Sequence, residues 1–273
     1  MKKIDFAIII TAEKCNPNGD PVNGNMPRQD YDGYGEISDV CIKRKIRDCL
    51  QENGEKILVE RNDLMNEGML YSIKDRVNAV PELKHFAKER NSVDFLRFAC
   101  KNWYDVRAFG QMFPFKGLIN STPINVRGPV SMGIATSLVP VTIMPFGITK
   151  TTNLEKSDPG KDKASIATRY MIDRGAYVSY GSISPQLAKK SGFDEKDAEK
   201  LKNAIIHMLD NDASSSRPAG SMSSTLFWAE HSTEYGNLPP HKVYELFGIE
   251  HSSEYPYFKY VIKHADGIKI EVY

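Results

Sequence analysis

A mixed α/β (α+β) fold is predicted, because short apolar runs typical of strands alternate along the chain with amphipathic segments typical of helices. Apolar residues make up 41% and charged residues 26% of the 273 residues, the composition of a globular protein with a sizeable buried core. Neither an internal repeat nor a low-complexity linker divides the sequence, so we expect one elaborated domain over residues 1–273.

The first element is an apolar run that reads DFAIIITA from Asp5 to Ala12. Both alternating faces are apolar, which is typical of a central strand covered from both sides. Asp5 interrupts the apolar stretch behind Met-Lys-Lys, so we interpret this start as a strand and not as a signal peptide. No stretch has the length of a membrane span, and we expect a cytoplasmic protein without membrane contact. Turn-favouring glycines and asparagines follow, and we place a loop insertion at residues 13–37.

A helix is expected from about Ser38, a suitable N-cap, to Gln51. Its apolar stripe consists of Ile42, Ile46, Cys49 and Leu50. Much of the remaining surface is basic and comprises Lys43, Arg44, Lys45 and Arg47. At about 100° per residue, Lys43 and Arg47 lie together, Arg44 lies beyond them, and Lys45 falls on the opposite flank.

The middle of the chain is less regular. We expect a helical insertion over residues 53–120, in which a helix from about 92 to 109 gives the clearest pattern. Residues 122–149 are rich in valine, isoleucine and threonine with interspersed glycine and proline, which is typical of strands and turns. Residues 150–172 lose the apolar pattern and become basic; we interpret them as a protruding insertion between two strands, with a flexible surface loop as the plainer alternative.

The second half returns to regular elements. We expect a strand at 175–180, a helix capped by Asp194, and a strand at 223–230. A hairpin is predicted between 257–263 and 268–272, joined around Asp266-Gly267. The resulting order, β–α–insertions–β–α–β, is the order of an expanded fold of the RNA-recognition-motif type.

Three segments hold groups that could contact phosphates. A phosphate backbone beside the basic helix would relieve the repulsion among its cations. A solvated helix face whose cations pair with nearby acids would have the same sequence pattern. The segment NDASSSRPAGSM at 211–222, named the late loop here, offers hydroxyls, backbone N–H groups and one arginine, or it is a simple connecting turn. The third is the basic insertion at 150–172. Net charge is only +1, so binding must depend on where the charges lie.

Catalytic and metal-binding patterns are weak. The six histidines form no H-E-x-x-H motif, and no two of them have a spacing typical of metal ligands. Four cysteines, at 15, 41, 49 and 100, fit neither zinc nor a disulfide framework, and we expect free thiols in a reducing compartment. Asp20 and Asp30 in the first loop could bind a hard metal ion, but aspartate in such loops usually serves turns.

Several long segments together resemble the backbone subunit of type I-C (Csd subtype) CRISPR Cascade complexes, a member of the repeat-associated mysterious protein (RAMP) superfamily. The segments are NPNGDPVNGNMPRQD, ISDVCIKRKIR, INVRGPVSMGIATSLVPVTIMPFG, GAYVSYGSISPQLAKKSGFDEKDAEKL and NDASSSRPAGSM. They occur in the family's order over nearly the whole chain. The resemblance implies a modified RNA-recognition-motif or ferredoxin-like palm with an antiparallel sheet, a finger-like insertion at 53–120 and a thumb-like insertion at 150–172.

The resemblance also implies a function. Several copies would polymerise along one CRISPR RNA through phosphate contacts that are independent of sequence, leaving the bases free to pair with target DNA in antiviral defence. The implied partners are the CRISPR RNA, target DNA through guide pairing, further copies of the chain, an RNA-processing subunit and a large subunit. No catalysis, cofactor or metal is implied. A near-neutral subunit suits this assembly, because strongly positive copies would repel one another.

By position, the resemblance implies RNA contacts in four segments: Arg28 in the first loop, Lys43, Arg44 and Arg47 in the basic helix, Lys150 and Arg169 in the thumb-like insertion, and Ser216, Arg217 and Met222 in the late loop. Two other functions remain open. One is a metal-dependent endoribonuclease of the RAMP family, with Asp20 or Asp30 as the catalytic aspartate. The other is a sequence-specific single-strand binder that stacks bases on Tyr177 and Tyr180.

Overall fold

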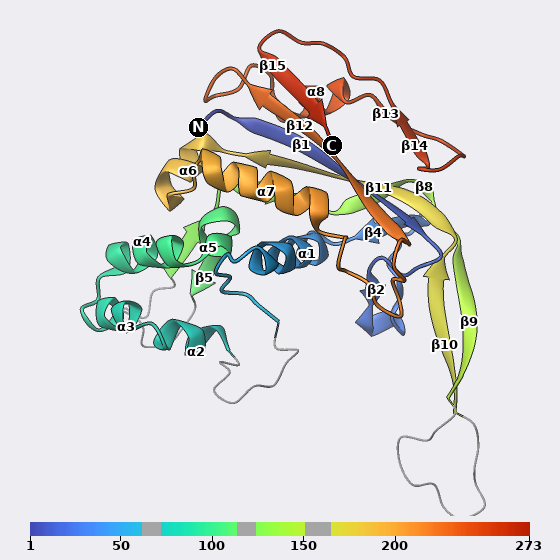
Figure 1. Cartoon of the computed structure of the whole chain (residues 1–273), viewed down its shortest axis with the longest axis horizontal. Helices are drawn as coiled ribbons and strands as arrows, with labels where there is room; N and C mark the ends of the chain where they lie inside the picture. The colour runs from blue at the N-terminus through green and yellow to red at the C-terminus, as the bar shows by residue number, and fades with distance from the viewer. Residues whose placement is uncertain (62–71, 114–123, 151–164) are drawn as a thin grey trace, which may run out of the picture.

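The computed structural model describes residues 1–61, 72–113, 124–150 and 165–273, and within them seven antiparallel strands form the central sheet (Figure 1). Across the sheet the strands run β15–β12–β1–β11–β8–β4, and β7 also pairs with β11. Their bounds are β1 Ile4–Glu13, β4 Tyr34–Ile37, β7 Val130–Met132, β8 Ala135–Pro140, β11 Arg174–Ile183, β12 Met222–His231 and β15 Ile268–Val272. The predicted fold class, mixed α/β with an antiparallel sheet, is confirmed.

Strand β1 is the centre of the core, as its sequence predicts. It pairs with β11 from Ile4↔Ile183 to Glu13↔Arg174, and with β12 from Ile4↔Glu230 to Ala12↔Met222. Every residue of β1 except Glu13 is buried. Its side chains alternate between two hydrophobic clusters, one on each face of the sheet, so helices must cover both faces.

One face is covered by α1 (Asp39–Glu52), α6 (Pro185–Ser191) and α7 (Glu195–His207) (Figure 1). The predicted N-caps are both present: Ser38 accepts from the backbone N–H of Cys41, and Asp194 forms a capping box with Asp197. The expected stripe of α1 is buried at Ile42, Ile46, Cys49 and Leu50.

The opposite face is covered by α8 (Pro240–Leu246) and a hairpin of β13 (Ile249–His251) and β14 (Phe258–Tyr260). The predicted C-terminal hairpin is therefore wrong, because β14 pairs with β13 while β15 pairs with β12. The physical reason is burial. Strand β12 has an open edge, and pairing with it buries Ile268, while pairing with β13 lets Phe258 pack under α8.

Residues between α1 and β7 build a separate helical layer with its own hydrophobic cluster. Its elements are α2 Ile73–Asn78, α3 Pro81–Lys88, α4 Ser92–Asn102, α5 Tyr104–Phe109, β5 Gly110–Phe113 and β6 Ile124–Arg127. The single helix predicted from 92 to 109 is wrong, since the chain becomes extended at Trp103 (φ −123°, ψ 126°). This break lets α4 and Trp103 pack in the helical layer while Tyr104 packs in the main core.

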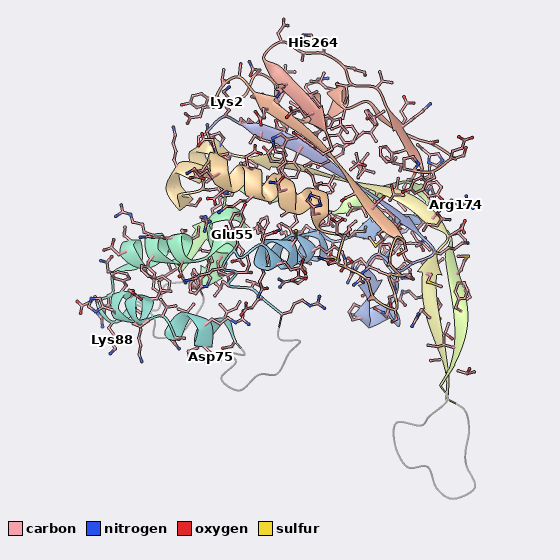
Figure 2. The ribbon with its side chains drawn as sticks, in the orientation of Figure 1. Lys2, Glu55, Asp75, Lys88, Arg174 and His264 are labelled. Carbon is pink, nitrogen blue, oxygen red and sulfur yellow. The ribbon has the colours of Figure 1, made fainter. Side chains whose placement is uncertain are left out.

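Ion pairs fasten this layer to the main core. Arg107 at the end of α5 binds both carboxylate oxygens of Asp197 in α7, at 2.9 and 2.8 Å. Glu55, just after α1, pairs with Arg107 and with Lys200, and Figure 2 shows it where α1, α5 and α7 meet. None of the helices in the described residues is both long and apolar enough to span a bilayer.

Two smaller two-stranded sheets lie next to each other outside the main sheet. Strands β9 (Ile143–Lys150) and β10 (Ser165–Ile172) form a ribbon that projects from the main sheet (Figure 1). In the first loop, β2 (Gly19–Asp20) and β3 (Met26–Pro27) pair across a 3₁₀ turn at Pro21–Asn23. The basic insertion also contains lysines at 156, 161 and 163, which lie outside the described residues.

Candidate nucleic-acid interface

The late loop is the junction at which three other segments meet. From the first loop, the backbone N–H of Asn16 donates to the carbonyl of Ser216 at 2.8 Å. From the ribbon, Arg169 donates through Nη1 to the carbonyl of Ser215 at 2.7 Å. Helix α1 joins through Lys45, which pairs with Asp212. The structure thus brings together all four segments in which the sequence predicts RNA contacts.

Asp212 binds two cations and so connects the late loop to α1. Its carboxylate accepts from Lys45, whose side chain is buried, and from Nε of Arg217 at 2.8 Å. Sequence reasoning did not single out Asp212. The sequence did indicate that Lys45 has a separate partner, because its position on the helix points it away from Lys43 and Arg47. Two cations therefore share one carboxylate here.

The outward cations of α1 are paired within the helix. Lys43 contacts Asp39 at 2.9 Å and Arg44 contacts Asp48 at 2.8 Å, both at a spacing of four residues. All four side chains are half-buried. Arg44 also donates to the carbonyl of Val59. This is the arrangement of a helix face paired with local acids, which the sequence left open as the plainer interpretation.

Arg47 differs from the other cations of α1, because its partner is deep in the structure. Asp105 is 1% exposed and accepts from Arg47 Nε at 3.0 Å and from the backbone N–H groups of Leu58 and Val59 at 2.8 and 3.1 Å. Burial lowers the pKa of the Arg47 guanidinium, and Asp105 opposes that shift. Its predicted phosphate contact stays a prediction, while its observed role is to fasten the helical layer to α1.

Phe109 confirms the predicted helical geometry of the basic face. The Lys43 ammonium lies 5.9 Å from the centre of the Phe109 ring and the Arg47 guanidinium 5.1 Å from it. Two cations four residues apart thus meet the same ring at the end of α5. Lys43 therefore faces the helical layer, and not the late loop.

The two aspartates of the first loop serve turns. Asp20 accepts from the backbone N–H of Val22 and pairs with Arg28 at 3.4 Å. Asp30 Oδ1 accepts from the backbone N–H groups of Asp32 and Tyr34 at 3.0 and 2.8 Å. Within the part of the chain that the structure describes, no three His, Cys, Asp or Glu side chains gather closely enough to hold a metal ion. The turn interpretation accounts for both aspartates.

The remaining predicted contacts lie beside the late loop or on the ribbon. Ser216 and Met222 are half-buried in the loop itself. Arg169 lies opposite Phe146 across the ribbon. Lys150 pairs through its backbone with Ser165 at the end of the ribbon, and its side chain lies outside the described residues.

The tyrosine platform expected of a single-strand binder is not formed by Tyr177 and Tyr180. Tyr177 is 1% exposed and packs in the core beneath α1 and α7. Tyr180 is on the other face, where its ring stacks on Tyr244 of α8 at 4.4 Å. Residues three apart in a strand point to opposite faces, so these two rings cannot serve one base-stacking surface.

One histidine, His231, and three of the four cysteines are buried. His231 and Asp5 are both inside the core, with Nε2 and Oδ2 2.8 Å apart. The other ring nitrogen of His231 accepts from the backbone N–H of Asn237, so neither nitrogen is open to a substrate. All four cysteines are free, and burial raises the pKa of each thiol, that of Cys100 to about 11.

Comparison with known proteins shows a family and a similar fold. A family model described as "CRISPR-associated protein Cas7" matches residues 2–271. The "CRISPR-associated protein Cas7" of Haloferax volcanii is 25% identical over 233 residues, which is 81% of this chain and 68% of that protein. A chain of a solved "CRISPR RNA-guided surveillance complex, pre-nicking" has a similar fold, with a TM-score of 0.54 at 12% identity, covering 87% of this chain and 79% of that one.

Proposed function

The chain belongs to the Cas7 family of CRISPR-associated proteins, and on that premise we propose that it is a non-catalytic, RNA-binding backbone subunit of a cytoplasmic type I-C Cascade complex. Copies of it bind along a guide RNA through the sugar-phosphate backbone. The bases stay available to pair with target DNA, and an RNA-processing subunit and a large subunit complete the assembly.

The observation that carries this proposal is the meeting of four segments at the late loop. Asn16, Lys45 and Arg169 reach the loop from three different parts of the chain. Hydroxyls, backbone N–H groups and a guanidinium gather there, and these are groups that contact phosphates without distinguishing one base from another. A binding surface of this kind suits a guide whose spacer sequence varies.

The carboxylates beside the cations define how binding would occur. Ion pairs at i and i+4 stabilise a helix by only about 0.3–0.5 kcal/mol each, and the four side chains of these two pairs keep 19–35% of their surface exposed. An incoming phosphate can therefore take Lys43 or Arg44 from its aspartate at small cost. Separating Arg47 from the buried Asp105 costs far more, on the order of 3–5 kcal/mol, so we leave Arg47 out of the exchanging set.

The endoribonuclease alternative has less support. It needs Asp20 or Asp30 to bind a metal ion, and both are occupied in turns, Asp20 also with Arg28. Guide-matched RNA and repeat RNA, each incubated with purified protein with and without magnesium, test this alternative. Metal-dependent cleavage that is lost in Asp30→Ala would replace the scaffold proposal with the enzyme.

Co-expression with a CRISPR array and the neighbouring subunits tests the proposal directly. We expect a ribonucleoprotein with several copies of this chain on RNA of fixed length, seen by native mass spectrometry. Arrays with unrelated spacers should give the same particle, because the contacts are to phosphates. Recovery of the chain free of RNA, or loading that depends on spacer sequence, would contradict the proposal.

A further inference from the structure

A rigid acidic turn presents a tyrosine to solvent at the tip of the first loop. Tyr31 is 109% exposed, so its ring is as open as in an isolated residue. Asp30 fixes the turn by accepting from two backbone N–H groups, and Gln29 donates to the carbonyls of Gly33 and Val141. Asp32, also exposed, completes an acid–aromatic–acid tip whose shape is set before any partner arrives.

An open groove of about 600 Å³ lies between α1, the end of α5 and strands β5 to β7. Its apolar wall includes Phe109, Val126 and Val130, with Met112 56% exposed at its side. Two cations line it, Lys43 and Arg127. Arg127 is exposed and has no carboxylate partner among the residues that the structure describes.

We propose that the Asp30–Asp32 tip of one copy docks in this groove of the next copy. The Tyr31 ring would pack on Phe109 and Met112, and the tip carboxylates would face Arg127. Tyrosine buried among apolar side chains is a typical anchor of a protein interface, and opposite charges set its orientation. The inference rests on the proposed function, to which it adds the two faces that meet between copies.

The placement of the two features suits a head-to-tail assembly. In Figure 1 strand β4, which begins just after the tip, and strand β5 lie at opposite ends of α1. Tip and groove are different surfaces of one chain. When two copies dock, one tip and one groove therefore stay free at the two ends of the pair. Such a contact extends into a filament, or into a ring if the rotation closes. A filament can follow an RNA strand.

The chemistry of the groove favours a protein occupant over RNA. Phosphate binding needs several cations, whereas the lining of the groove includes only two, Lys43 and Arg127. The rest of the lining includes five apolar side chains, Phe109, Met112, Val126, Val130 and Met132. An acidic tip with one exposed aromatic ring matches this combination more closely than a polyanion does.

Charge reversal across the contact tests the proposal. The variants are Tyr31→Ala, Asp32→Arg, Arg127→Asp and the double variant Asp32→Arg with Arg127→Asp, with Tyr235→Ala as a control at another highly exposed tyrosine. Self-association without RNA is measured by sedimentation, and loading on a long RNA by counting copies per strand. A short RNA that holds one copy reports the affinity of the single chain.

Each single variant should weaken the copy–copy contact. For Tyr31→Ala the loss should be about 30-fold or more, as for a hot-spot tyrosine. The double variant should restore the contact. Affinity for the short RNA should not change. Wild-type behaviour of Tyr31→Ala in both assembly assays overturns the proposal, and so does a loss of short-RNA affinity in Arg127→Asp, which would make the groove a nucleic-acid site. Failure of wild type to bind any RNA defeats the proposed function instead, while self-association without RNA still decides the docking.

Discussion

Removing the two aspartates that pair with the outward cations of α1 should strengthen RNA binding. In Asp39→Asn with Asp48→Asn, Lys43 and Arg44 lose the carboxylates at 2.9 and 2.8 Å that a phosphate would have to displace. If the two pairs cost about 0.3–0.5 kcal/mol each to separate, their removal gains roughly 0.6–1 kcal/mol. That corresponds to a three- to five-fold lower Kd.

The assay is fluorescence anisotropy with a short labelled RNA over a range of salt concentrations. The logarithm of affinity should fall more steeply with salt in the variant, since each newly available cation adds up to about 0.7 to the slope for single-stranded nucleic acid. A matched control adds the same charge far from the site. Glu245→Gln with Glu250→Gln breaks two exposed pairs, with Lys242 and Lys259, on the face covered by α8.

The difference between the two double variants isolates the local effect from the change in net charge. Equal affinity gains in both would show that only the overall charge matters. Weaker binding in Asp39→Asn with Asp48→Asn, at an unchanged melting temperature, would refute the exchange of carboxylate for phosphate and remove this face of α1 from the RNA path.

Three further outcomes follow from buried groups. Arg47→Ala should lower Tm by roughly 6–20 °C, because Asp105 would keep a buried charge without its partner, at a cost on the order of 3–5 kcal/mol; a Tm within 2 °C or so of wild type would place Arg47 outside the structural core. Cys100, with its pKa raised to about 11, should resist alkylation at pH 8 until the protein is unfolded, and its modification in the native protein would contradict this environment. Burial opposes ionisation of Asp5, but its hydrogen bonds, above all the one with His231, hold its pKa below the ordinary 3.8. The contribution of Asp5 to stability is therefore present above about pH 4 and is lost as the pH falls further. Urea unfolding at several acidic pH values should therefore show a weaker pH dependence in Asp5→Asn, and an unchanged dependence would assign the acid sensitivity elsewhere.

Local patterns in the sequence predicted the elements whose structure depends on local chemistry. Ser38 and Asp194 cap helices because their side chains reach the next turn, and DFAIIITA is buried on both faces as its composition indicates. The predictions that failed depend on distant partners. Ile268 pairs with His231 in β12, and Trp103 interrupts a helix because two hydrophobic clusters compete for the same segment.

In the candidate site, too, the sequence predicted the local features and missed the partners that are distant in sequence. Helical periodicity places Lys43 and Arg47 side by side, and both meet Phe109. Periodicity could not reveal that Asp105 and Asp212 approach α1 from other parts of the chain, since neither is near α1 in sequence. The partners of a charged side chain are set by tertiary packing, and a list of cations therefore overstates the number available to RNA.

The position of β1 in the middle of the sheet affects how the protein is made. Its first neighbour, β11, begins only at Arg174 and its second, β12, only at Met222, so β1 leaves the ribosome long before either partner exists. Contacts so distant in sequence form slowly, and an unpaired apolar strand is prone to join another nascent chain. The yield of folded protein should therefore increase with chaperone supply and at a lower growth temperature, by more than the stability of the mature protein would indicate.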